Sequence, residues 1–509
     1  MTAAADLVLT NAEVHTLATP DATHGAVAVR DGAIVRLGDA WEVGHLAGVE
    51  TEVIDLEGRP VLPGFVDAHT HLTMLGQYLV HADLRGADGP DECVERLRKA
   101  AAEGDGWVLG FGFDESGWAD PRYLDRDDLD AVADSRPVVA FREDMHVAGV
   151  NSVALDRHLE AMPEDDVRTE AGEPTGVLVE EAIDVVYRAI EPGRAESEEL
   201  LRAAQAEANR LGVTAVHDMV RRSYAPEVYR ALDRAGELTL RVRLNYWSDH
   251  LDAVREAGLA TNDGSSMVRV GAIKTYTDGS LGGRTAKLHE PYADGEGTGQ
   301  WVVDPDELEA LVERADGAGL QLAAHAIGDA AVDAVLEAYA DTDDPAGARH
   351  RVEHAELTSD AAVERFAELG AVASVQPNFL KWARPGGLYE QRLGPERGAA
   401  TNRYRDLLDA GVPLAFGSDG MPLDPLFGVH QAVNHPTEDQ ALTVTEALRA
   451  YTRGGAYAGF DEGRLGTVAV GKRADLVALD GSPWDRPEAI EDLEVALTVV
   501  DGDVVFDAR

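Results

Sequence analysis

The residues of this chain that could carry out chemistry are four histidines, one lysine and one aspartate, each near the end of a short apolar, strand-like segment. Imidazole nitrogens and carboxylate oxygens are ligands that borderline divalent cations accept. Polar residues at the ends of parallel barrel strands converge on the face where such barrels carry out catalysis. The sequence therefore predicts a metal site built from His69, His71, Lys274, His325, His354 and Asp419.

The spacing of His69 and His71 has a geometric reason. Residues i and i+2 of a strand point to the same side, so both imidazoles face one way, and Asp67 precedes them on that face. We expect Asp67 to support the pair rather than to bind metal. A lone His-x-His pair is weak support, because the chain has 16 histidines and a strand-end histidine is often structural. The joint pattern over several strands favours the metal site.

Lys274 needs a separate explanation, because two divalent cations would repel an ammonium group. Reaction of the neutral amine with CO₂ gives an anionic carbamate, whose two oxygens can bridge two metals. Burial near cations favours loss of the amine's proton. The alternative is an ordinary ammonium group paired with Asp278. The chain has only five lysines, so one among apolar strand residues stands out, and we prefer the carbamate.

The elements that must position these residues alternate between strand-like and helix-like segments, which is typical of a parallel sheet with crossover helices. Helical patterns cover 305–319 and 359–370, for example. Eight such strands are the number of a (β/α)₈ TIM barrel. The predicted strands are 60–71, 212–218, 238–247, 267–276, 320–328, 350–356, 371–377 and 412–419.

The segments outside the barrel pattern predict two further parts. Short strands at both ends of the chain indicate a composite β-sandwich domain of 1–61 and 466–509, around a barrel of 62–465. The gap after the first barrel strand is too long for a loop, so 73–200 is predicted to be an insertion domain. Its place after that strand puts it at the mouth of the barrel, where it could cover the active site.

Composition excludes several classes of function. The 509 residues include 45 basic and 93 acidic side chains, for a formal net charge of −48. Such a surface would repel nucleic acid and anionic membranes. Apolar stretches recur throughout the chain, which excludes disorder. Dissolved salt screens the repulsion among many like charges. Because the acidic residues are spread from Asp6 to Asp507, we favour a protein of a salt-accumulating organism. The alternative is an acidic surface that binds a partner.

The predicted location is the cytoplasm. Cys93 is the only cysteine and cannot form an intramolecular disulfide, so nothing indicates an oxidising compartment. The first residues lack the basic segment and the following apolar segment of a signal peptide. The sequence also contains no run of about 18 apolar residues, the length needed to span a bilayer.

Taken in order, the motifs of this chain resemble those of the amidohydrolase superfamily, and within it the YtcJ-like group of amidohydrolase family 3. Two segments are similar to that group in particular, namely 273–286 and the insertion around 146–155. The resemblance covers nearly the whole chain. Its motifs are VLPGFVDAHTHL (61–72), IKTYTDGSLGGRTA (273–286), HAIGD (325–329), RVEHAE (351–356), ASVQPNF (373–379), FGSDGMPLDP (416–425) and EGRLGTVAVGKRADLVALD (462–480).

The resemblance implies a role for each candidate ligand. His69, His71 and Asp419 would hold one metal, and His325 and His354 the second, with carboxylated Lys274 and a hydroxide between them. Asp419 would accept the proton of the attacking hydroxide and pass it to the leaving amine. Two divalent ions are therefore expected, with zinc preferred and Mn, Fe or Co also compatible.

Further residues are candidates for binding the substrate, on weaker grounds. Each is as readily explained as a loop salt bridge, a structural residue or core packing. They are Asp278, Arg284, His146 and His217, with Trp118, Asn151 and Trp382 as possible pocket walls.

The function implied is hydrolysis of a C–N bond in a small molecule, an amide or an N-substituted formamide. Ester or lactone hydrolysis at the same site is the first alternative, and a non-catalytic binding or scaffold barrel is the second. A homodimer is compatible with the resemblance.

The charge predicts that the melting temperature rises with KCl into the molar range, because counterions screen repulsion among the carboxylates. Thermal unfolding followed at increasing KCl measures this. A melting temperature indifferent to salt would refute the salt-adaptation interpretation.

Overall fold

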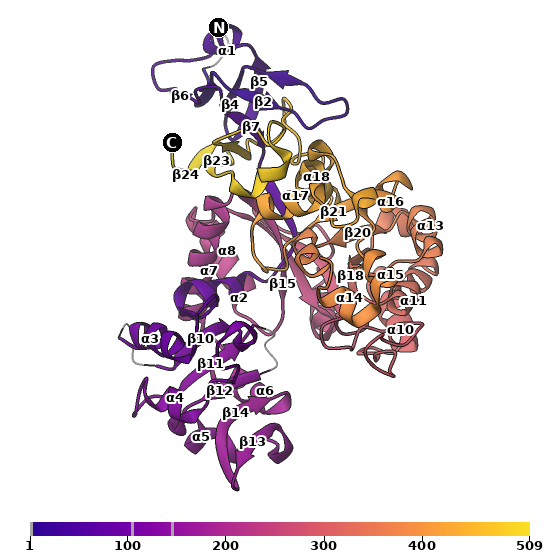
Figure 1. Ribbon diagram of the computed structural model, residues 1–509. Helices are drawn as coiled ribbons and strands as arrows, with labels where there is room; N and C mark the ends of the chain where they lie inside the picture. The colour runs from indigo at the N-terminus through magenta and orange to yellow at the C-terminus, as the bar shows by residue number, and fades with distance from the viewer. Residues whose placement is uncertain (1–3, 103–105, 144–146) are drawn as a thin grey trace. The chain divides into compact units, whose positions relative to one another are not determined.

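The computed structural model describes residues 4–102, 106–143 and 147–509 (Figure 1). The chain divides into two compact units. The first consists of Met1–His71, Gln205–Arg222 and Tyr229–Arg509, and the second of Leu72–Ala204 and Ser223–Val228.

The first unit contains the predicted barrel, which is confirmed. Its eight strands are all parallel and are hydrogen-bonded in chain order from β8 to β21. The strands are buried along nearly their whole length, as expected when helices cover a parallel sheet. They are β8 (Phe65–Thr70), β15 (Val213–Val220), β16 (Arg241–Trp247), β17 (Val268–Tyr276), β18 (Gln321–Ala326), β19 (Arg351–His354), β20 (Val372–Val375) and β21 (Leu414–Phe416).

The first predicted strand is in fact two strands that belong to different sheets. β7 (Pro60–Pro63) pairs with terminal strands, and β8 starts the barrel after Gly64. A Cβ on Gly64 would come within 2.3 Å of the Thr214 side chain, so only glycine lets the chain pass here. The apolar run 60–66 hides this change of sheet, because both strands are buried.

Local sequence explains where the barrel helices begin and end. Asp304 accepts a hydrogen bond from the amide of Asp306 at the start of α10, and Ser359 accepts one from Ala362 in α13. Gly370 ends α13 with φ +62°, in the left-handed region that glycine adopts without strain. The helices include α9 (Leu251–Glu256), α10 (Pro305–Asp316), α11 (Asp329–Ala340), α13 (Asp360–Leu369), α16 (Tyr404–Asp409), α17 (Pro425–Val433), α18 (Val444–Arg449) and α19 (Gly455–Ala458).

Both ends of the chain contribute to two further sheets of the first unit. A four-stranded sheet has the order β5-β4-β1-β6 and a six-stranded sheet the order β24-β23-β22-β7-β2-β3. One buried apolar cluster contains side chains of both sheets, such as Leu7, Val27, Leu476 and Leu497. The strands are β1 (Leu7–Thr10), β2 (Glu13–His15), β3 (Thr23–His24), β4 (Ala26–Arg30), β5 (Ala33–Gly38), β6 (Glu52–Asp55), β22 (Leu476–Leu479), β23 (Val495–Val500) and β24 (Asp503–Asp507).

The second unit has its own sheet and its own core. Six strands lie in the order β13-β14-β12-β11-β10-β9, with buried aromatic residues such as Phe111 and Phe141 stacked at 5.1 Å. The strands are β9 (Ala82–Asp83), β10 (Val108–Phe113), β11 (Val138–Arg142), β12 (Val147–Val150), β13 (Val167–Glu170) and β14 (Glu173–Val179). The helices include α2 (Leu72–Val80), α3 (Pro90–Ala101), α4 (Arg126–Asp130), α5 (Ser152–His158) and α6 (Glu181–Ala189).

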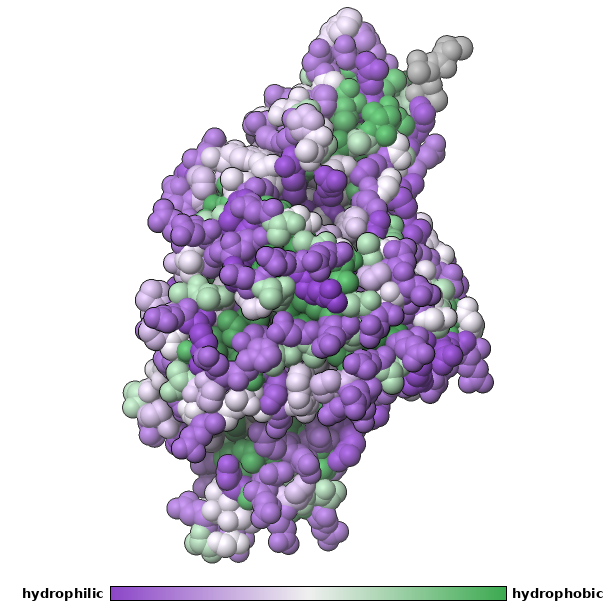
Figure 2. All heavy atoms as spheres, turned by 90° about the vertical axis from the view of Figure 1, so that its right-hand side faces the viewer, coloured by the Kyte–Doolittle hydropathy of each residue, from purple (hydrophilic) through white to green (hydrophobic). Residues whose placement is uncertain are grey.

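The surface accounts for much of the negative charge. Hydrophilic residues cover most of the face shown in Figure 2, with smaller hydrophobic patches between them. Acidic side chains such as Asp31, Asp127 and Asp360 are almost fully exposed. Among the described residues, no helix is long and apolar enough to cross a membrane.

Candidate metal centre

The barrel places all six predicted ligands at or just beyond the carboxyl ends of its strands. His69 is the second-to-last residue of β8, and His71 directly follows that strand. Lys274, His325 and His354 lie near the ends of β17, β18 and β19, and Asp419 follows β21. Because the strands are parallel, these positions share one end of the barrel, where barrel enzymes carry their chemistry.

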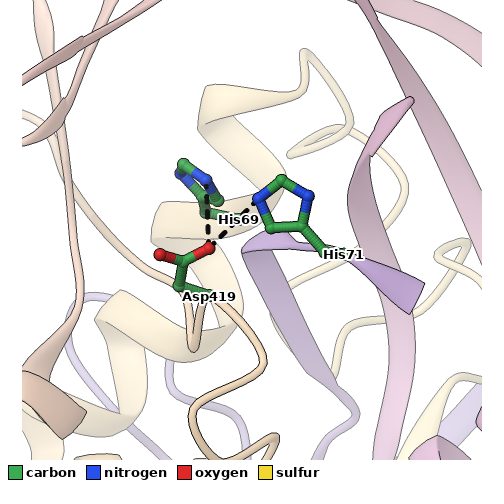
Figure 3. A group of neighbouring side chains, drawn as sticks. All are labelled: His69, His71 and Asp419. Atoms are coloured by element: carbon green, nitrogen blue, oxygen red, sulfur yellow. Dashed lines mark ion pairs between the residues drawn. The ribbon is translucent and has the colours of Figure 1, made fainter. Parts of the chain in front are cut away.

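Three of these residues form a group able to hold a metal ion. One ligand atom from each of His69, His71 and Asp419 lies within 4.8 Å of the others. Asp419 Oδ1 is 3.2 Å from His71 Nε2 and 3.6 Å from His69 Nε2 (Figure 3). Figure 3 shows both rings turned toward the same carboxylate, with His69 and His71 coming from one strand and Asp419 from a separate loop.

The other two histidines continue this group along the barrel mouth. The ring centroids of His69 and His354 are 5.0 Å apart, and those of His354 and His325 are 4.5 Å apart. Lys274 Nζ lies 5.0 Å from the centre of the Tyr276 ring, which itself lies 4.5 Å from the His325 ring. The structure therefore brings the candidate ligands of β17, β18 and β19 together beside the His69 cluster.

The hydrogen bonds of the histidines leave specific nitrogens available for a metal. His69 Nδ1 donates to the Glu353 carboxylate at 2.6 Å, so its Nε2 carries the lone pair. His325 Nε2 donates to the Gly279 carbonyl at 2.9 Å, which leaves Nδ1 as its acceptor. His354 Nδ1 is buried and has no hydrogen-bond partner among the described residues. A buried orphan nitrogen is costly unless a ligand satisfies it.

Burial keeps these imidazoles in the neutral form that binds metal. It holds the pKa values of His69, His325 and His354 well below the usual range, and nearby positive groups, including Lys274, lower them further. Asp419 is affected in the opposite way. Burial alone would raise its pKa, but His69, His71 and Lys274 outweigh this and lower the pKa to about 2.

Lys274 is a fully buried amine near these ligands. Burial lowers its pKa to about 8, against the opposing effect of Glu353 and Asp419. Within the described part of the chain no ion pair joins Lys274 to Asp278, the partner that the ammonium alternative requires. Burial thus makes the neutral amine more accessible at Lys274 than at an ordinary surface lysine.

The backbone at two candidate ligands is strained. His354 has φ +72° and Asp419 has φ +56°, in the left-handed region that residues with a Cβ seldom adopt. Such strain persists where the surroundings fix the conformation, and it is common at functional sites.

Asp67 connects the first and last strands of the barrel. Its Oδ1 accepts hydrogen bonds from the amides of His69 and Ser418, at 3.0 and 3.1 Å. The amide of Asp419 in turn donates to the His69 carbonyl at 2.7 Å. A Cβ on Gly417 would lie 2.5 Å from the His69 backbone nitrogen, so glycine is required for this close approach. The expected supporting position of Asp67 agrees with these contacts.

Sequence reasoning missed the pair Glu353 and Arg351, which lies directly behind His69. Both side chains are fully buried, and Arg351 Nε donates to Glu353 Oε1 at 2.7 Å. Arg351 also donates to the Ala68 carbonyl and to Ser374 Oγ, at 2.6 and 2.9 Å. The available signal was the charge itself, because two charged residues inside a strand buried on both faces must be paired.

The weaker substrate-binding candidates have other partners in the structure. Asp278 accepts hydrogen bonds from the amides of Lys287, Ile327 and Gly328, and it lies 3.5 Å from His325 Nε2. Arg284 makes a bidentate salt bridge with Asp294 on an exposed loop. These contacts agree with the structural alternatives, and a role in substrate binding stays a prediction for both.

The remaining candidates are distributed through both units. His217 is buried with its Nδ1 2.6 Å from Arg351 Nη1, and His146 lies outside the described residues. In the second unit, Trp118 packs in the core and Asn151 caps α5. Trp382 lies beside Phe379, whose ring stacks on His354 at 5.9 Å.

Comparison with known proteins assigns the chain to a family. The model of the amidohydrolase family matches residues 52–506. This chain belongs to the amidohydrolase family. It is 33% identical to the protein YtcJ of Bacillus subtilis (strain 168), over 95% of this chain and 96% of the relative. It is 30% identical to the N-substituted formamide deformylase of Arthrobacter pascens, over 99% of this chain and 98% of the relative.

A solved structure gives the same result for the fold. An uncharacterized metal-dependent hydrolase from Pyrococcus furiosus superimposes with a TM-score of 0.81 and 33% identity. The match covers 94% of this chain and 99% of that protein. Family membership, the barrel and the cluster of His69, His71 and Asp419 together identify a metal-dependent hydrolase of the amidohydrolase superfamily.

The residues of this amidohydrolase fit a divalent metal on physical grounds. Neutral imidazoles, an ionised carboxylate and a buried nitrogen without a partner are the groups that a borderline cation satisfies. Glu353 and the Gly279 carbonyl fix two of the rings from behind, which is the usual support for metal-binding histidines.

Replacing Glu353 by Gln should weaken metal binding by about 10- to 100-fold, because His69 loses its anionic hydrogen-bond partner. It should also destabilise the fold by about 3–5 kcal/mol, because the buried Arg351 guanidinium loses its carboxylate. Metal titration and thermal unfolding measure the two effects.

A matched control is Glu462→Gln, which removes the carboxylate paired with the partly exposed Arg349 at 2.7 Å. It should cost under about 1 kcal/mol and leave metal affinity unchanged. Equal effects of the two substitutions would contradict the role assigned to Glu353.

Proposed function

We propose that this amidohydrolase uses water to hydrolyse the C–N bond of N-substituted formamides, releasing formate and an amine, or of closely related amides, releasing the corresponding carboxylate and an amine. The observation that carries the proposal is the convergence of His69, His71, Lys274, His325, His354 and Asp419 at one end of the barrel. The substrate class is supported by full-length similarity to the N-substituted formamide deformylase of Arthrobacter pascens.

The proposed site holds two divalent ions, with zinc preferred and Mn, Fe or Co compatible with the same donors. His69, His71 and Asp419 hold one ion, and His325 and His354 supply ligands for the second. These two histidines alone would give too few ligands, and a carbamate on Lys274 would supply further anionic oxygen donors. Divalent ions held by these residues would supply activation of a water and polarisation of a carbonyl.

Asp419 is the proposed proton carrier. It is ionised before the reaction, so a carboxylate oxygen is free to accept a proton from the attacking water. Passing that proton to the amide nitrogen makes the amine a competent leaving group. Its strained backbone and its bond to the His69 carbonyl keep the carboxylate at the ligand cluster.

The function predicts that purified protein supplied with metal contains two divalent ions per chain and releases formate from N-substituted formamides. Asp419→Asn and His325→Ala should each lower kcat/KM by about 100-fold or more, with the fold retained. His325→Ala should also lower the metal content toward one ion. Elemental analysis, formate release and circular dichroism measure these outcomes.

The control is His289→Ala, an exposed histidine that pairs with Asp333 and is not one of the candidate ligands. It should keep both metal content and activity. Activity on esters or lactones alone would replace the amide proposal with the ester alternative, and a chain that binds no metal would indicate a non-catalytic barrel.

The carbamate predicts a distinct spectroscopic result. Protein equilibrated with metal and ¹³C-bicarbonate should show a carbamate carbon signal that Lys274→Arg lacks, because arginine does not form this adduct under these conditions. Lys287→Arg, a half-buried lysine hydrogen-bonded to Thr298, is the matched control and should retain the signal. A spectrum without the signal in the wild type would leave Lys274 as an amine.

A further inference from the structure

The amino-terminal end of the barrel, opposite the candidate metal centre, contains a second polar site. The segment after α19 passes across the starts of the strands there. Gln321, the first residue of β18, donates to the Ala458 carbonyl at 2.9 Å, and Arg243 in β16 donates to Asp461 at 2.8 Å. A small cavity at this end has room for about one water-sized species and is lined by Val66, His217, Arg241, Arg243, Arg269 and Asp461, among others.

The ion pairs around this cavity have an excess of positive charge. Asp461 is shared by three guanidinium groups, since it accepts hydrogen bonds from Arg243, Arg269 and Arg464 at 2.8 to 3.2 Å. Asp475 and Asp501 are already bonded to Arg241, at 2.6 and 2.5 Å. The network as a whole contains five arginines and three aspartates: Arg241, Arg243, Arg269, Arg464, Arg473, Asp461, Asp475 and Asp501.

One hydrogen-bond donor of this network has no acceptor. The Arg243 side chain is only 5% exposed, and its Nη1 is buried with no partner among the described residues. Its other nitrogens are used by Asp461 and by Asn262 Oδ1 at 2.8 Å. An unpaired buried guanidinium nitrogen is costly, so an acceptor is expected beside it.

His217 supplies a second donor at the same place. A guanidinium only donates hydrogen bonds, so His217 Nδ1 accepts from Arg351 Nη1 at 2.6 Å. The neutral ring therefore carries its proton on Nε2. A Cβ on Gly459 would lie 2.8 Å from this Nε2 and 2.5 Å from Arg243 Nε, so glycine keeps the space between the two side chains open.

We propose that this cavity binds one small monatomic anion, chloride under ordinary conditions. The lining of the cavity combines apolar side chains with the donors Arg243 and His217, while both oxygens of Asp461 are already occupied by arginines. A water molecule would need acceptors for its own hydrogens, whereas a halide accepts from every donor. A cavity with room for about one water-sized species favours a monatomic ion over a larger oxyanion. The anion offsets the excess of arginine charge beneath the barrel.

The proposal is tested by comparing chloride with gluconate at matched potassium concentrations. In wild-type protein, chloride should raise the melting temperature by several degrees above gluconate and reach a plateau, because a ligand of the folded state stabilises it. Arg243→Gln should abolish that difference. Arg255→Gln, which removes the same charge from an exposed helix position, should retain it.

A second measurement does not depend on any variant folding. Wild-type crystals grown in bromide should show anomalous scattering within hydrogen-bonding distance of Arg243 Nη1. Equal melting temperatures in chloride and gluconate, or a water without bromide at that position, would overturn the proposal.

Discussion

The closure of the barrel between β8 and β21 is the constraint on which the candidate metal centre depends. Among the described residues no β-ladder joins these two strands, and the seam is held by other contacts. Asp67 accepts from the amides of His69 and Ser418, and the Asp419 amide donates to the His69 carbonyl. The same few bonds that close the barrel therefore bring His69 and Asp419, from opposite ends of the barrel sequence, to one metal position. A change that opened the seam would separate the ligands before it unfolded the strands.

The interior of the barrel is polar along its axis, which is unusual for a buried region. At the carboxyl end lie the histidines and Asp419; behind them lies the fully buried pair of Glu353 and Arg351. Arg351 reaches His217, which in turn faces the cavity lined by Arg243. Removing one member of such a connected set leaves its buried partner without compensation. We therefore expect substitution of any one of these residues to destabilise the fold. The candidate ligand His69 is thereby held by a network that extends to the opposite end of the barrel.

Much of the architecture could be predicted from the sequence because the barrel strands are short, mostly apolar runs, several of which carry a polar residue at or just beyond their carboxyl end. The candidate ligands were proposed from the same pattern, since His69, His325 and His354 lie at or next to the ends of buried strands. The change of sheet at Gly64 was missed because β7 and β8 are both buried and only backbone crowding by Thr214 separates them. The partners of Glu353 and Arg243 were not predicted either, since which buried charge meets which depends on barrel packing between distant segments.

The net charge of −48 therefore describes the surface better than it describes the interior. Around the candidate metal centre, Asp419 and Glu353 face Lys274 and Arg351, which gives a neutral set before any metal binds. Two divalent ions would add four positive charges to a region where burial already disfavours charge. The proposed conversion of Lys274 from an amine to a carbamate would replace a group that repels metal ions with an anionic one, without adding a residue. Among the described residues no carboxylate forms an ion pair with this buried lysine, which suits that conversion.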